Sequence, residues 1–126
     1  MDYKEELVER FGKQLIEEVR DRQIHYIDAF LEQKSHESKR YKDEISELSP
    51  AQVEMIKEMA VRWVDGTLHD LLYMLEDSKW IKLRLEGESG VLEDIRQATD
   101  ADIQAYIFIW AEKYSTKRLT DYTKRY

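Results

Sequence analysis

The chain has 126 residues, with 20 basic and 27 acidic side chains and a net charge of −7 at neutral pH. This length fits one domain, and the acidic balance disfavours nucleic-acid binding because it repels the phosphate backbone. The chain has no cysteine, which excludes thiol chemistry and favours a reducing compartment, so we expect a cytoplasmic protein.

The sequence predicts no membrane association. Its longest uninterrupted apolar run is Tyr106–Ala111, far shorter than the ~20 residues that a membrane-spanning helix needs. The first twelve residues are acidic and lack the apolar segment of a secretory signal.

The first predicted helix runs from about Asp2 to about Gln33. Gly12 weakens this helix locally but does not have to break it. Apolar residues recur at helical spacing and predict a core-facing stripe, which is made of Leu7, Val8, Phe11, Leu15, Ile16, Val19, Ile24, Ile27, Phe30 and Leu31.

The next segment, residues 34–42, is polar and predicts a connection, with a short helical turn around residues 43–48. Ser49, Pro50 and Gln52 then give a strong start signal for a second helix, because serine caps, proline suits the first turn and glutamine completes a capping box. The apolar period stays in phase across Gly66, so we expect this helix to continue to Glu76.

A β-hairpin is predicted over about residues 80–96. Strands at Ile81–Leu85 and Val91–Ile95 are separated by the turn residues of 87–90. We expect four side chains of this hairpin to pack on the helices: Ile81, Leu83, Leu85 and Val91.

A last helix is predicted over about residues 99–118, capped by Thr99 or Asp100 and followed by a basic tail to residue 126. Residues 1–126 therefore predict a single domain of the α+β class, mostly α, with helices over residues 1–78. Its expected architecture is three or four helices packed with a small β-hairpin.

One helix edge carries the most suggestive polar residues. Asp65, His69 and Tyr73 follow each other at four-residue spacing, so an aspartate could orient an imidazole there. The simpler interpretation is a helix-surface ion pair beside a tyrosine at the core margin. No second histidine at helical spacing completes a metal site.

Two acidic clusters lie on the first predicted helix. Glu5, Glu6 and Glu9 form an EExxE pattern, and Glu18 and Asp21 form an ExxD pattern. They resemble the magnesium-binding clusters of all-α nucleoside triphosphate pyrophosphohydrolases, but one straight helix cannot fold back to clamp an ion between them. A small metal-dependent hydrolase, using these carboxylates or the Asp65/His69 pair, is kept as the alternative function.

The C-terminal half carries a further resemblance. Val64-Asp65, Leu68-His69, Leu71-Leu72, Leu75-Glu76, Asp94-Ile95 and residues 110–115 resemble a group of small bacterial proteins with a VDxxLHxLLxxLE helix and a WxEKYS ending. This resemblance implies a toxin-neutralising immunity protein or a similar interaction protein. It brings no catalytic residues.

We therefore expect a non-catalytic protein-binding module without a cofactor. An acidic surface suits a basic protein partner because unlike charges steer association. The expected contact residues are Glu86, Glu88, Glu93, Asp94, Asp100 and Asp102. A nucleic-acid role for the basic residues of 113–126 is disfavoured, and a homodimer is left open.

Overall fold

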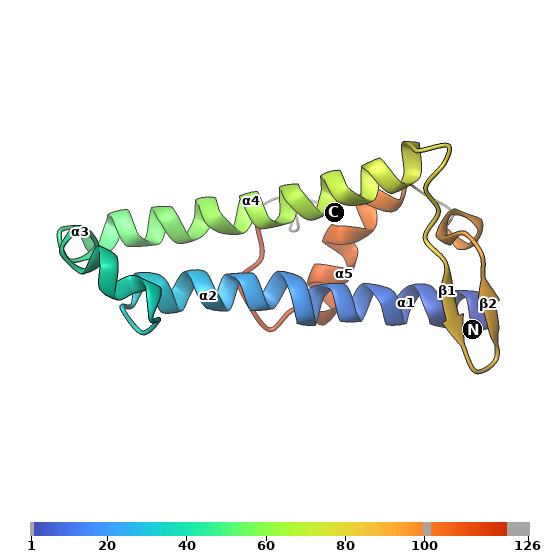
Figure 1. Ribbon diagram of the computed structural model, residues 1–126, viewed down its shortest axis with the longest axis horizontal. Coiled ribbons are helices and arrows are strands. Elements are labelled where there is room, and N and C mark those ends of the chain that lie inside the picture. Colours follow the sequence, from blue (N-terminus) through green and yellow to red (C-terminus); the bar gives the residue numbers. More distant parts are fainter. Residues whose placement is uncertain (1, 100–101, 121–126) are drawn as a thin grey trace.

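The computed structural model describes residues 2–99 and 102–120, which are mostly helical and include one two-stranded antiparallel hairpin. Two long helical rods lie side by side, with α3 at one end and the hairpin near the other (Figure 1). The first rod joins α1 (Tyr3–Leu15), a π-helical turn η1 (Ile16–Arg20) and α2 (Asp21–Leu31). The second rod is α4 (Pro50–Asp77). The predicted mostly helical α+β architecture is confirmed.

The predicted start and length of α4 are also confirmed. The Ser49 hydroxyl accepts a hydrogen bond from the Gln52 amide at 3.1 Å, and the Gln52 side chain accepts one from the Ser49 amide at 2.8 Å. This reciprocal pair satisfies two helix-end donors. The helix continues through Gly66 without a break and is 28 residues long in total.

The π-helical turn changes which face of the first rod is buried. A π turn holds an extra residue, so it rotates the side chains that follow it. Ile16, Arg20 and Ile24 therefore continue the buried row, whereas Val19 is 42% exposed. The prediction that Val19 belongs to the core is wrong for this reason.

The connection between the rods contains two short helices. A 3-10 helix, η2 (Glu37–Tyr41), lies within the polar connection, and α3 (Lys42–Ser46) follows it. The short helical turn predicted around residues 43–48 is therefore present, beginning one residue earlier.

The hairpin is shorter than predicted. Its strands are β1 (Leu85–Gly87) and β2 (Gly90–Leu92), with Gly87 paired to Gly90. This register places Leu92 opposite Leu85, and side chains alternate between faces, so Leu92 is buried while Val91 is exposed. The expectation that Val91 packs on the helices is wrong because the turn sets the opposite phase.

The last helix is also shorter than predicted. Two 3-10 helices, η3 (Ile95–Ala98) and η4 (Ile103–Ala105), precede α5 (Tyr106–Tyr114). The helix ends before Ser115 because residues 115–118 bond to the first rod instead, as described below. The expected cap Asp100 lies outside the described residues.

The main hydrophobic core lies at the hairpin end of the molecule. Trp110 of α5 is fully buried and packs edge-on against Phe11, with ring centres 5.7 Å apart. The core unites α1, the second half of α4, the hairpin and α5; its buried members are Leu7, Val8, Leu15, Ile16, Leu68, Leu72, Leu92, Ile95, Ile103, Ile107, Trp110 and Ala111.

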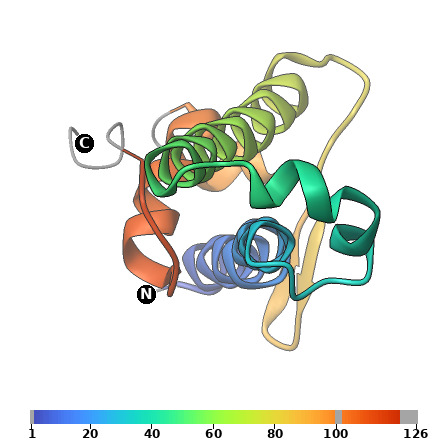
Figure 2. The ribbon, with the colours of Figure 1, turned by 90° about the vertical axis from the view of Figure 1, so that its left-hand side faces the viewer.

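Beyond this core the two rods continue as a two-helix arm, which we define as residues 19–64. Ile24, Leu31, Ile45 and Val61 are buried within the arm, but none of them belongs to the main cluster. Figure 2 shows α5 on one side of the rods and α3 on the other. No helix in the described part of the chain is long and apolar enough to cross a bilayer.

Candidate functional site

An open apolar groove runs along the two-helix arm between α2 and α4. Its volume is about 680 Å³. Its lining comes from η1, α2, η2 and α4 and includes no residue of α5 or of residues 115–120. The lining residues are Val19, Gln23, Tyr26, Ile27, Phe30, Leu31, Glu37, Ile56, Ala60, Trp63, Val64, Thr67 and Leu68.

Buried side chains form the base of the groove, and exposed aromatic side chains border it. Ala60, Leu31 and Leu68 are buried at its base. Tyr26 on α2 is 54% exposed and Trp63 on α4 is 66% exposed. Met59, four residues before Trp63, is exposed on the same helix face.

The groove is poor in charge. Charged residues make up 37% of the chain, yet among the described residues that line the groove Glu37 alone is charged at neutral pH. Charge depletion with exposed tryptophan, tyrosine and methionine is typical of the centre of a protein–protein interface. The groove therefore has the character of a surface that binds an apolar protein surface.

On another face of the first rod, a buried polar network surrounds Arg20. The Arg20 side chain has no exposed surface, and its guanidinium donates to Asp65 at 2.6 Å from Nε and 3.2 Å from Nη2. Nη1 donates to Ser115 Oγ at 2.9 Å and Nη2 donates to the Arg118 carbonyl at 2.7 Å. Arg20 therefore ties both rods to the segment after α5.

Asp21 completes this network. It accepts a hydrogen bond from Ser115 Oγ at 2.6 Å and one from the Thr116 amide at 2.9 Å. Arg118 adds a two-pronged ion pair with Asp28, at 3.0 and 2.7 Å. Residues 115–118 thus lie bonded along α2 rather than continuing a helix.

The Arg20–Asp65 ion pair replaces the interaction predicted between Asp65 and His69. Asp65 is buried against Arg20, while His69 Nδ1 lies 3.3 Å from Asp70. The predicted Asp65–His69 helix pair is therefore wrong, because Arg20 offers Asp65 a two-pronged partner in the interior. Tyr73 is half exposed at the end of this row.

The structure brings together no metal-binding cluster of three histidine or acidic side chains in residues 2–99 and 102–120. Asp21, from the predicted ExxD pattern, is held by Ser115 and Thr116. Glu9, from the EExxE pattern, accepts from Trp110 Nε1 at 3.1 Å and forms an ion pair with Lys113. These two carboxylates have structural partners from the C-terminal part of the chain.

The predicted acidic contact residues fall into separate settings. Glu86 and Glu93 are exposed on the hairpin, and Arg84 pairs with both, at 2.7 and 3.3 Å. Glu88 is exposed in the hairpin turn, and Asp102 is exposed just before η4. Asp100 lies outside the described residues.

Asp94 differs from these residues because it is buried. Its carboxylate accepts from the Arg96 side chain at distances of 2.7 to 3.0 Å. Arg96 Nη1 in turn donates to the carbonyls of Glu76 and Ser78, at 3.0 and 2.9 Å, at the end of α4. Asp94 thus positions the arginine that caps α4, and its carboxylate is not presented to a partner.

This pair predicts an acid-dependent loss of stability. The hydrogen bond from Arg96 lowers the pKa of Asp94 below its usual value of about 3.9. A lowered pKa in the folded state means stability that is present above the unfolded pKa and lost as pH falls through the folded pKa. We expect Asp94→Asn to lower the free energy of unfolding by about 1.5 kcal/mol at pH 7.

The measurement is urea unfolding of the wild type, Asp94→Asn and Glu93→Gln at several pH values. Glu93 is the matched control because it is an exposed neighbour. The difference between wild type and Asp94→Asn should shrink below pH 4. A constant difference down to pH 2 would contradict the assigned role of the ionised carboxylate.

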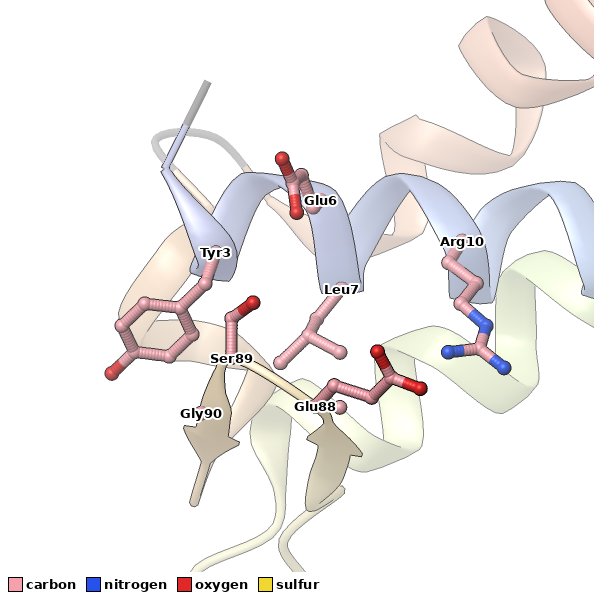
Figure 3. A pocket seen from close by; sticks show the side chains of 8 residues that line it. Tyr3, Glu6, Leu7, Arg10, Glu88, Ser89 and Gly90 are labelled. Carbon is pink, nitrogen blue, oxygen red and sulfur yellow. The ribbon is translucent and has the colours of Figure 1, made fainter.

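A smaller polar hollow of about 220 Å³ lies between the start of α1 and the hairpin turn. Figure 3 shows Tyr3 and Arg10 of α1 extending to the side of the helix where the turn lies, with the Glu88 carboxylate directed toward the side of Arg10. A side chain at Gly90 would meet the Tyr3 ring at 2.7 Å. The hollow therefore follows from the close approach of the hairpin to α1.

Sequence patterns missed Arg20 as a member of the interior. One signal was present: Arg20 stands four residues from both Ile16 and Ile24, in an apolar row. Asp65 likewise stands between Val61 and Leu68. Two opposite charges that each interrupt an apolar row are candidates for a buried pair.

Comparisons with known proteins give no family. No protein-family model matches the chain, and no solved structure is significantly similar to it. A stretch of 54 residues is 28% identical to the ABC transporter C family member 3 of Arabidopsis thaliana. This stretch is 43% of the present chain and 4% of the transporter, so the chain spans a small fraction of that protein and the likeness shows neither fold nor activity.

Proposed function

We propose that the protein is a non-catalytic protein-binding module whose main contact surface is the groove of the two-helix arm. The observation that carries this proposal is the groove itself, which is open, nearly uncharged and bordered by the exposed side chains of Trp63 and Tyr26. Large apolar surfaces of this kind on a folded chain mark interaction sites.

The energetics favour this surface over the acidic hairpin. Burying one large apolar side chain contributes about 1.5–3 kcal/mol, and tryptophan and tyrosine are enriched among residues that dominate binding energy. By contrast, Arg84 already forms ion pairs with Glu86 and Glu93, and exposed ion pairs contribute little.

Toxin neutralisation, which the resemblance to small bacterial proteins implies, remains part of the proposal as a second contact. Glu88 and Asp102 are exposed acidic residues that a basic partner could meet. Neither residue lines the groove, so the two contacts use different surfaces. We expect Glu88→Lys to slow association with a basic partner while leaving thermal unfolding unchanged.

The alternative of a metal-dependent hydrolase has less support. Asp65, which it would use, is already paired with Arg20. Binding of magnesium, manganese or zinc in a stoichiometric amount, lost in Asp65→Ala or His69→Ala, is the result that would restore it.

The proposal is tested by affinity capture with tagged wild type, Trp63→Glu and Trp80→Glu. Trp80 is 86% exposed and is absent from the groove lining, so it is a matched control for the same chemical change. We expect Trp63→Glu to lose the protein that wild type retains, because a carboxylate cannot enter an apolar interface without a large desolvation cost. Trp80→Glu should retain it, and equal retention by all three proteins would contradict the proposal.

A further inference from the structure

We infer that the protein chain that fills the groove is a second copy of this chain, so that two arms form a symmetric dimer. The inference rests on the proposed function, since it takes the groove to be a protein contact. It adds the identity of the partner.

The shape of the arm is the first argument. The arm contains two helices side by side, α2 and the first half of α4, without the α5 cover that completes the hairpin end. Ile24 and Val61 are buried in the arm, while Trp63, Tyr26 and Met59 remain exposed. Two such helix pairs placed face to face make a four-helix bundle, in which each helix buries its apolar stripe.

Charge is the second argument, and it distinguishes a second copy from a basic partner. Two chains that each carry a net charge of −7 repel each other through their acidic surfaces. Their repulsion is weakest on a face that carries few acidic side chains. Among the described residues that line the groove, Glu37 is the one charged at neutral pH. Arg22 lies in the exposed helix row of Tyr26 and Asp70 in that of Trp63, and these two side chains have opposite charges.

The groove also presents few acidic side chains for a basic partner to bind. A strongly basic protein gains from complementary acidic side chains. The exposed carboxylates of Glu86, Glu88 and Glu93 lie on the hairpin, outside the lining of the groove. The observations therefore favour a near-neutral, self-complementary contact at the groove.

Self-complementarity is the third argument. In a two-fold contact one surface must supply both ridge and hollow. The Trp63 side chain is 66% exposed and supplies the ridge. Ala60, one helical turn earlier, has a small buried side chain at the base of the groove and supplies the hollow. A two-fold axis across the groove lets the Trp63 ring of each copy enter the hollow of the other.

The test is sedimentation equilibrium of the full chain, wild type beside Trp63→Glu and Trp80→Glu. Wild type and Trp80→Glu should sediment at twice the chain mass of 15.2 kDa. The dimer dissociation constant of Trp63→Glu should rise at least about thirtyfold, since a dominant interface residue is lost from each of the two copies. Circular dichroism of each variant checks that the helices remain folded.

A second measurement avoids the disruptive variant. In Trp80→Phe, Trp110 is fully buried and Trp63 is the exposed tryptophan. Dilution should shift the fluorescence emission to longer wavelength over the same concentration range in which the mass halves, because dissociation exposes Trp63 to water.

The outcomes separate the two proposals. A wild-type monomer whose Trp63→Glu variant loses a different captured protein overturns the second copy and keeps the binding groove. A monomer that retains nothing through Trp63 overturns both. A dimer that persists in folded Trp63→Glu also overturns the inference, because its contact then lies elsewhere.

Discussion

Arg20→Met is expected to lower the free energy of unfolding by about 3–5 kcal/mol, because it leaves buried carboxylates without their cation. Asp65 is almost fully buried and loses both of its bonds to the guanidinium. Asp21 loses a buried ion pair at 3.3 Å, and the Arg118 carbonyl loses its donor. The measurement is urea unfolding monitored by circular dichroism.

Two further variants identify the cause of this loss. Arg22→Met makes the same change at an exposed neighbouring position and should alter stability by less than about 0.5 kcal/mol. The double variant Arg20→Met/Asp65→Leu should recover part of the loss, because replacing a buried ion pair by apolar side chains is often neutral. A double variant that is less stable than Arg20→Met would contradict an uncompensated carboxylate as the cause.

Gly12→Ala is expected to lower the free energy of unfolding by about 1–3 kcal/mol, despite the usual preference of helices for alanine. A Cβ atom at Gly12 would lie 2.4 Å from two ring atoms of Trp110, which is fully buried. The ring is held by Phe11 and by the hydrogen bond to Glu9, so α1 and α5 have to move apart.

Gly66→Ala is the matched control, because it makes the same change inside α4. No atom lies within 4 Å of a Cβ built there. Alanine is favoured over glycine in a helix by about 1 kcal/mol, so this variant should gain stability. Thermal melts of the two variants should therefore shift in opposite directions, and a stabilised Gly12→Ala would refute the close contact with Trp110.

The sequence predicted the elements that depend on local signals. The cap at Ser49 and the unbroken α4 follow from residues that are neighbours in the chain. The end of α5 could not be predicted in this way, because it depends on bonds from Ser115 to Arg20 and Asp21, more than ninety positions away. The phase of the second strand depended on a turn register that Gly87 and Gly90 set together.

The candidate site was harder to predict than the fold. Val19, in the π-helical turn, lies in the lining of the groove and outside the buried row, and the apolar stripe alone does not reveal such a turn. Trp63 continues the apolar period of α4, so its sequence position is equally consistent with a core or an exposed residue.

The Arg20 network also has a consequence for the order of folding. Ser115 and Arg118, which bind Arg20, follow it in the chain by 95 and 98 residues. The contact closes a loop of 95 residues between Arg20 and Ser115, and such closures are slow compared with helix formation. Helix formation along the rods can therefore precede the closure of this loop, and the interior charge of Arg20 acquires its full set of partners only after residues 115–118 have been made.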